Sequence, residues 1–161
     1  MQLKLSKHLL IGAIAAATLA TACATGPVRR VSDPAVSFQQ IQVLPSGSWS
    51  VDLRIQNYSS IPMQFDSVNL KMTIDGQDAA TVNQAIAMTV GPESPDIIKI
   101  NVEPNIVGKA AVADALARKT TLNYRLTGTV VAVPEKRSRH TFKFNGASSL
   151  SPAPGLPGVL R

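Results

Sequence analysis

The alternation of apolar and polar residues at positions 49–56 limits the fold of this chain more than any other feature. The run WSVDLRIQ places Trp49, Val51, Leu53 and Ile55 on one side of an extended backbone and polar residues on the other. A strict period of two predicts a half-buried β-strand. Turn formers at 57–60 and then Pro62 follow, so we expect the chain to reverse there at a sheet margin.

A second strand is expected at 63–74, and its alternation changes phase once. Met63 and Phe65 lie in one phase, whereas the apolar residues from Val68 to Ile74 lie in the other. A slip near Asp66 and Ser67 therefore predicts a β-bulge. The dipeptide Asp75-Gly76 tolerates the positive φ angles of a type I′ hairpin turn, so an antiparallel partner should follow directly.

The remaining patterns predict five more strands and one helix. Strands are expected at 36–44, which contains a second bulge, and at 80–90, 98–102, 122–132 and 140–144. The helix is expected at 106–118 with Asn105 as its N-cap. Its apolar positions, taken at helical spacing, are Val107, Ala110, Ala111 or Ala113, and Leu116 or Ala117. About seven short strands with regular turns favour an antiparallel β-sandwich, and the shallow alanine face places the helix across one end or edge.

The amino terminus predicts export. A short basic stretch precedes the 12-residue apolar run Leu9–Ala20, which is too short to span a bilayer, and small residues follow. Residues 1–22 are therefore interpreted as a signal peptide. The following Cys23 is the chain's single cysteine, and an exported protein cannot use a lone thiol for an internal disulfide.

The segment Leu19-Ala20-Thr21-Ala22-Cys23 resembles a bacterial lipobox, in which the cysteine sulfur receives a diacylglycerol. The resemblance implies lipidation of Cys23 and a tether at residues 23–33. Ordinary cleavage is the alternative, since Ala20-Thr21-Ala22 also fits a signal without lipid. Because Ala24 follows instead of the Asp typical of inner-membrane retention, the expected address is the outer membrane of a Gram-negative bacterium, on its periplasmic face.

Composition argues against nucleic acid as a partner. Lys and Arg number 16 against 10 Asp and Glu, but Lys4 and Lys7 lie in the leader. The other basic residues mostly alternate singly with apolar ones, whereas nucleic-acid binders gather them on one face with aromatics between. A membrane, reached through the lipid anchor, is the expected partner instead.

No motif in the sequence indicates catalysis, a cofactor or a metal. His140 is the one histidine outside the leader. It lies in an inward phase of the last strand, and a lone histidine of this kind is more often a packing or surface residue than a catalytic one. Asp52, Asp75 and Asp78 would form a cation cluster only if the fold brought them together, and Asp75 is already explained by its turn. We therefore expect a protein that is not an enzyme, with no catalytic residue, cofactor or metal.

The densest basic run, Lys136-Arg137-Ser138-Arg139, follows the strand at 122–132 and is interpreted as a hairpin tip. A solvated turn is one interpretation, because a short run of charged residues often does no more than keep a turn exposed to solvent. The other reading makes Lys136, Arg137 and Arg139 contacts for anionic lipid headgroups. The closing segment 147–161 carries Pro152, Pro154 and Pro157 and should be extended or disordered, unless its leucines and Val159 dock it on a sheet edge.

The order of these elements is similar to the LEA type 2 family, also called the WHy domain (water stress and hypersensitive response). The resemblance covers residues 36–146, within a domain expected at 34–146. It rests on NYSSIP at 57–62, where Tyr58 replaces the first Pro of the family's turn, on IDG at 74–76 and on YRLTG at 124–128. It implies a fibronectin-III-like or immunoglobulin-like sandwich with one helix, linked to desiccation and without catalytic residues.

Three functions stay open at this point. The resemblance implies a stress-protective envelope lipoprotein that stabilises membranes or client proteins. A lipid-binding or lipid-shuttling module is the second, with Ala110, Ala113 and Ala117 leaving room for an acyl chain, although small residues equally allow close packing. A structural, partner-binding domain is the third, since a sandwich fold hosts many functions.

Overall fold

The structure is a computed structural model, and it describes Gly26 and residues 29–161. Within this part of the chain there are eight strands and one helix. They are β1 (Ala35–Val43), β2 (Trp49–Gln56), β3 (Met63–Ile74), β4 (Gln77–Val90), β5 (Pro95–Val102), α2 (Ile106–Arg118), β6 (Leu122–Pro134), β7 (His140–Leu150) and β8 (Val159–Leu160).

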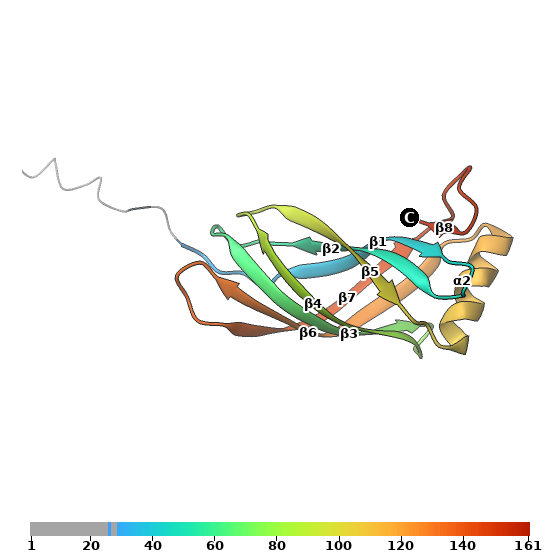
Figure 1. The fold of residues 1–161 in the computed structure, drawn as a ribbon, viewed down its shortest axis with the longest axis horizontal. Helices are drawn as coiled ribbons and strands as arrows, with labels where there is room; N and C mark the ends of the chain where they lie inside the picture. The colour runs from blue at the N-terminus through green and yellow to red at the C-terminus, as the bar shows by residue number, and fades with distance from the viewer. Residues whose placement is uncertain (1–25, 27–28) are drawn as a thin grey trace, which may run out of the picture.

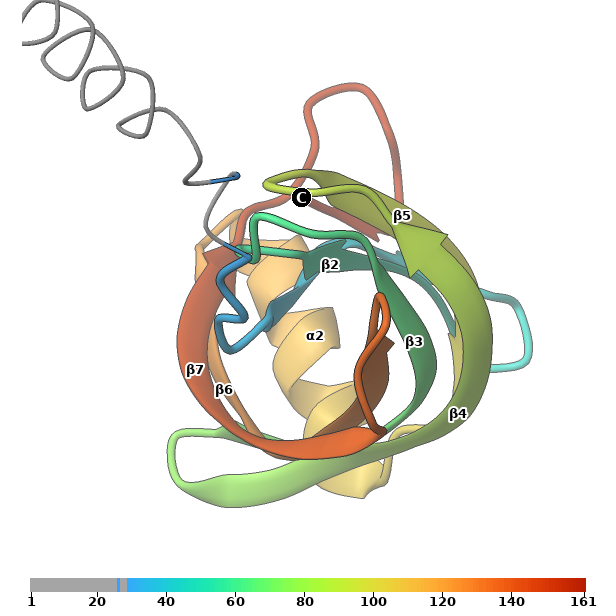
Figure 2. The same ribbon diagram turned by 90° about the vertical axis from the view of Figure 1, so that its left-hand side faces the viewer.

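The strands form two four-stranded sheets, in the orders β5-β2-β1-β8 and β4-β3-β6-β7. All neighbouring strands are antiparallel. The view along the long axis shows both sheets curving around one interior (Figure 2). The predicted mainly-β antiparallel sandwich is therefore confirmed, and β8 adds one strand to the seven expected.

The interior contains the residues that the alternation placed there. In β2, all four of the predicted inward side chains are buried. In β3, Met63 and Phe65 before the bulge and Val68 and Leu70 after it are all buried, because the register shifts between Phe65 and Ser67. Each such side chain contributes roughly 1.5–3 kcal/mol on burial, so the bulge keeps both phases of the strand in the core.

The predicted turn and the second bulge are also confirmed. Asp75 and Gly76 have φ angles of 49° and 77° and connect β3 directly to β4. In β1 the register against β2 shifts between Phe38 and Gln40, so Phe38 and Ile41 both reach the core.

The helix has the predicted bounds, and its most deeply buried residues are not those that the spacing predicted. Asn105 is the N-cap, as predicted, and Gly108, Val112 and Ala115 are the buried residues. Gly108 sets the orientation, because a Cβ there would lie 2.5 Å from the carbonyl oxygen of Ala79 at the start of β4. The expected face was right in part. Val107 is half-buried, and Ala111 and Leu116 are half-buried and pack against the core, whereas Ala110, Ala113 and Ala117 are exposed. The helix closes one end of the sandwich (Figure 1).

The segment 147–161 is ordered rather than extended as a free tail. Its first residues continue β7 as far as Leu150, and β8 pairs with β1 through Ile41 and Gln42. Leu150, Val159 and Leu160 are buried, whereas Leu156 remains 45% exposed. The docking alternative is the correct one, and the folded part continues past residue 146.

Candidate functional site

The two ends of the sandwich differ, and the chain enters at only one of them. We call the end formed by residues 29–32, 57–62, 91–94 and 135–139 the tether end. The opposite end, formed by α2 and residues 151–158, is the helix end (Figure 1). Cys23, the predicted lipidation site, lies outside the described residues, so its modification stays a prediction.

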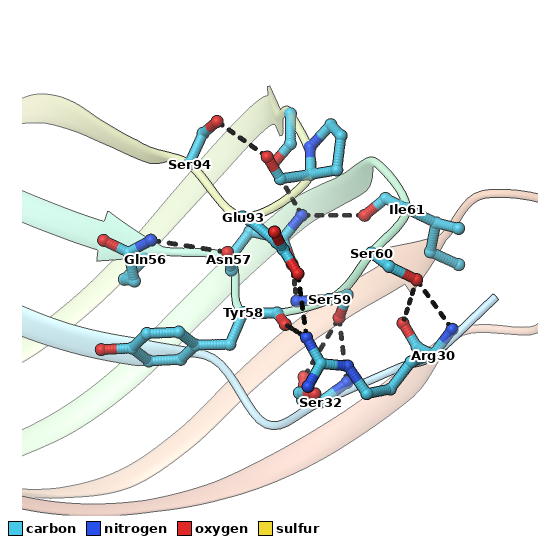
Figure 3. A network of polar contacts seen from close by, with 12 residues as sticks. Arg30, Ser32, Gln56, Asn57, Tyr58, Ser59, Ser60, Ile61, Glu93 and Ser94 are labelled. Carbon is cyan, nitrogen blue, oxygen red and sulfur yellow. Dashed lines mark hydrogen bonds and ion pairs between the residues drawn. The ribbon is translucent and has the colours of Figure 1, made fainter. Parts of the chain in front are cut away.

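A buried asparagine organises the tether end (Figure 3). The side chain of Asn57 is 0% exposed. Its Nδ2 donates to the carbonyl oxygens of Ile61, Val90 and Gly91 at 2.9, 3.2 and 2.8 Å. Its Oδ1 accepts from the backbone N–H of Ser59 at 2.8 Å. One side chain thus joins the turn after β2 to the end of β4, which belongs to the other sheet.

The same turn binds the incoming chain. The hydroxyl of Ser59, also fully buried, accepts from the N–H of Ser32 at 3.0 Å and donates to its carbonyl oxygen at 3.3 Å. The hydroxyl of Ser60 accepts from the N–H of Arg30 at 2.9 Å, and its own N–H donates to the carbonyl oxygen of Arg30 at 3.0 Å. Residues 30–32 are therefore fixed to the 57–61 turn.

Arginine side chains extend this attachment to two more loops. Arg30 donates from Nη2 to the carbonyl oxygen of Tyr58 at 3.0 Å and to Oε1 of Glu93 at 3.1 Å. Arg29 forms an ion pair with Glu135 in the β6–β7 turn. The exposed pairs contribute little individually, so the backbone contacts of the serines carry most of the attachment.

The predicted basic residues lie in the β6–β7 turn, as the hairpin interpretation requires. Lys136 is exposed and has a φ angle of 59°. Arg137 donates from Nη2 to the carbonyl oxygen of Arg29 at 3.2 Å. The Nη2 of Arg139 lies 2.8 Å from Oδ2 of Asp66, an ion pair without linear hydrogen-bond geometry. Arg139 is therefore paired with a carboxylate of the domain, whereas Lys136 and Arg137 are exposed and have no carboxylate partner among the described residues.

The other residues considered from sequence do not form a site. Asp52 is paired with Lys99 at 2.7 Å on one sheet and Asp78 with Lys71 at 2.9 Å on the other. Across Gly26 and residues 29–161, no group of three His, Cys, Asp or Glu is placed to hold a metal. The inward position expected for His140 was wrong. Its ring is exposed beside Phe142, with the centroids 4.6 Å apart, because it lies at the margin where β7 begins.

Tyr124 closes the seam between the sheets, a role that the sequence did not indicate. Its hydroxyl accepts from the N–H of Phe38 at 2.8 Å and donates to the carbonyl oxygen of the same residue at 3.2 Å. Burial raises the pKa of the phenol, and hydrogen bonds to Ser148 and Phe38 lower it by less. The phenol occupies backbone groups on the edge of β1 that a neighbouring strand would otherwise bind, which protects that edge.

The helix end carries an open groove of about 930 Å³. It lies between the carboxyl-terminal half of α2, with Ala113, Leu116 and Ala117, and the loop 151–158. Lys119, the left-handed C-cap of the helix, lies at its margin. The groove is mostly apolar with one cation, which is the composition of many small-ligand sites.

Comparison with known proteins finds similar solved structures only at low sequence identity. No protein-family model and no curated protein matches the sequence. A protein of Arabidopsis thaliana is similar in structure, with 10% identity over 78% of this chain and 81% of the other, and a TM-score of 0.49. Proteins from Bordetella pertussis (15% identity, 81% and 100% covered, TM-score 0.46) and Archaeoglobus fulgidus (12%, 77% and 98%, 0.44) are similar as well. Its own two antiparallel sheets, described above, define the chain as a two-sheet β-sandwich protein. No helix in the described part has the length and hydropathy needed to cross a bilayer.

Proposed function

We propose that this chain is a non-enzymatic envelope lipoprotein whose sandwich protects membranes or proteins during water loss. The lipid on Cys23 anchors it to the outer membrane, with the domain in the periplasm. Two or three acyl chains, at about 0.8 kcal/mol per buried methylene, hold a protein on a bilayer effectively permanently.

The observation that carries this proposal is the buried network around Asn57. The resemblance to the LEA type 2 family rests in large part on the turn 57–62, and this turn makes the contacts that join the two sheets to the incoming chain. A turn with that role is under strong structural constraint, because a buried amide without partners costs about 1–3 kcal/mol per group. This supports the proposal that the turn has the same architecture as the corresponding turn of the LEA type 2 family.

The experiment is drying of vesicles and of a labile enzyme in the presence of the purified lipoprotein. We expect less leakage of a trapped dye and more surviving enzyme activity than with an equal mass of an unrelated soluble protein. The Cys23→Ser chain is the matched control, because it should protect the enzyme equally and the vesicles less. Protection of neither target would contradict the proposal.

Lipid binding is the second candidate, and the groove at the helix end favours it. Its volume lies in the range of sites for small apolar ligands, and Lys119 suits a carboxylate at the rim. Native mass spectrometry of the detergent-free Cys23→Ser chain should then detect a bound fatty acid. Ala113→Trp fills the groove and should abolish binding, whereas Ala110→Trp, on the same helix but outside the groove, should preserve it.

A further inference from the structure

We infer that the sandwich is held end-on against the anionic leaflet that carries the Cys23 lipid, with the tether end at the headgroups and the helix end pointing away. This rests on the proposed lipid anchor. It adds to that proposal which surface meets the membrane, namely the β6–β7 turn with Lys136 and Arg137. It also adds which surface is left free for other contacts, namely the helix end.

The first step is that the chain is in contact with the domain from residue 29 onward. Arg29 contacts Glu135 and Arg137, the two residues that flank Lys136 in the β6–β7 turn. Arg30 and Ser32 are then bound by backbone contacts to the 57–60 turn. The chain therefore leaves the domain directly beside Lys136, and whatever holds the chain upstream holds this turn close to it.

The second step compares the reach of the tether with the length of the domain. From Cys23 to Arg29 the chain has six residues, which span at most about 20 Å. The 12 residues of β3 alone extend about 40 Å between the two ends. With the helix end on the membrane, the tether end would lie farther from the bilayer than the tether can reach, so this arrangement is excluded. End-on contact through the tether end and a domain lying on its side are the arrangements left.

The third step is the distribution of charge, which favours end-on contact. Arg29, Arg30 and Arg139 are each paired with a carboxylate of the domain. Lys136 and Arg137 have no acidic partner within the described residues, and both are exposed at the turn. Two exposed carboxylates, Asp33 and Asp96, lie nearby on the flanking segments. Lys109 and Lys119 at the helix end and Lys143 on β7 are also exposed without an ion pair among the described residues. The β6–β7 turn is the place where two such cations lie beside the point at which the tether leaves, so the attraction to anionic headgroups favours contact there.

The experiment measures depth at three positions in the full lipoprotein. Because Cys23 carries the lipid, an introduced cysteine is the sole free thiol for a fluorophore. Ser138→Cys reports on the β6–β7 turn, Asn69→Cys on the middle of a sheet face and Ala110→Cys on α2, and all three positions are exposed. The labelled proteins are reconstituted into phosphatidylglycerol-containing vesicles with headgroup quenchers. We expect quenching several times stronger at position 138 than at position 110, with position 69 between them.

The outcomes separate this inference from the proposed function. Equal quenching at the three positions, the signature of a domain lying on its side, would overturn end-on contact and leave the anchor intact. A mass spectrum of the purified protein without the diacylglycerol would overturn the anchor and, with it, the orientation. Strongest quenching at position 110 would contradict the attachment of residues 29–32 to the tether end.

The charge step is tested without the lipid, in the Cys23→Ser chain. Lys136→Gln with Arg137→Gln should weaken co-sedimentation with phosphatidylglycerol vesicles about fivefold for each cation removed. Lys109→Gln with Lys119→Gln makes the same charge change at the helix end and should have little effect. Arg139 stays intact because it is paired with Asp66. An equal loss from both pairs, or no binding by the parent chain, would overturn the charged contact.

Discussion

Two asparagines, one at each end of the sandwich, perform comparable local tasks in different surroundings. Asn57 begins a turn and is 0% exposed, with hydrogen-bond partners in its own turn and at the end of β4. Asn105 begins α2 and is exposed; its Oδ1 accepts from the N–H of Gly108 at 3.0 Å and its Nδ2 donates to the carbonyl oxygen of Asp78 at 2.7 Å. The tether end is thus held by buried polar contacts.

At the helix end, close packing of apolar atoms supplies the buried contacts. Gly108 lets the helix backbone approach Ala79, and Leu160 fills the core from the last strand. The same end leaves Ile106 84% exposed and the groove open. The two ends therefore differ in kind: buried polar contacts fix the tether end, whereas apolar surface stays exposed at the helix end.

The largest predicted effect distinguishes the two asparagines directly. Asn57→Ala leaves buried carbonyl oxygens without a donor and should lower the free energy of unfolding by about 4 kcal/mol. Asn105→Ala removes an exposed N-cap and should cost about 1 kcal/mol. Urea unfolding of both variants measures the difference. Equal losses would contradict the contrast between the ends.

The next effect concerns the last strand. Leu160→Ala removes a fully buried side chain and should cost about 3 kcal/mol, because a cavity remains beside β1. Leu156→Ala, in the same segment but exposed, should change stability by less than about 0.5 kcal/mol. Thermal unfolding compares the two. A similar, small effect of both would mean that the segment is not docked in solution.

The close approach of Gly108 to Ala79 at the helix end predicts a smaller, local effect on stability. Gly108→Ala forces the helix away from the carbonyl oxygen of Ala79 and should cost about 2 kcal/mol. Trp49, the single tryptophan, is buried in the strand beside this end, so its emission should shift in the variant. An unchanged stability and emission would show that the helix does not pack as closely as described.

The smallest effect concerns Tyr124, at the seam between the sheets, and it depends on pH. Tyr124→Phe keeps the ring stacked on Phe38 and loses the hydroxyl bonds, which should cost about 1 kcal/mol near neutral pH. Because the folded pKa of Tyr124 is raised, folding favours the neutral phenol, and this contribution is present below the ordinary value of 10.0. It is lost as pH rises from about 10 through the raised pKa, so the gap between wild type and variant should close there. A gap that widens would contradict the assignment.

The strands were predictable because their signals are local. Alternation in β2 and the phase change near Asp66 follow from neighbouring residues, and Asn105 marks the start of α2 within one turn of chain. The burial of Asn57 was not predictable to the same degree. Its bond to Ser59 is a local turn signal, but the bonds to Val90 and Gly91 join segments more than thirty residues away.

The errors have the same origin. Spacing alone left Ala111 or Ala113 and Leu116 or Ala117 as alternatives, and the contact between Gly108 and Ala79 orients the helix so that Ala111 and Leu116 pack against the core. Proline and glycine content favoured an extended or disordered closing segment over docking on a sheet edge, but β8 pairs with β1 and backbone bonds of residues 151, 153 and 158 hold the segment in place. Arg139 was grouped with Lys136 by sequence, whereas the bulge at Asp66 gives it a partner.

Amide hydrogen exchange of the Cys23→Ser chain tests the central claim, that the incoming chain is fixed to the tether end. The N–H of Ser32, bonded to Ser59, and the N–H of Ser59, bonded to Asn57, should exchange as slowly as amides within β2. The Asn57→Ala variant should release both. Exchange of the Ser32 amide in the parent chain at the rate of an unstructured peptide would contradict the account.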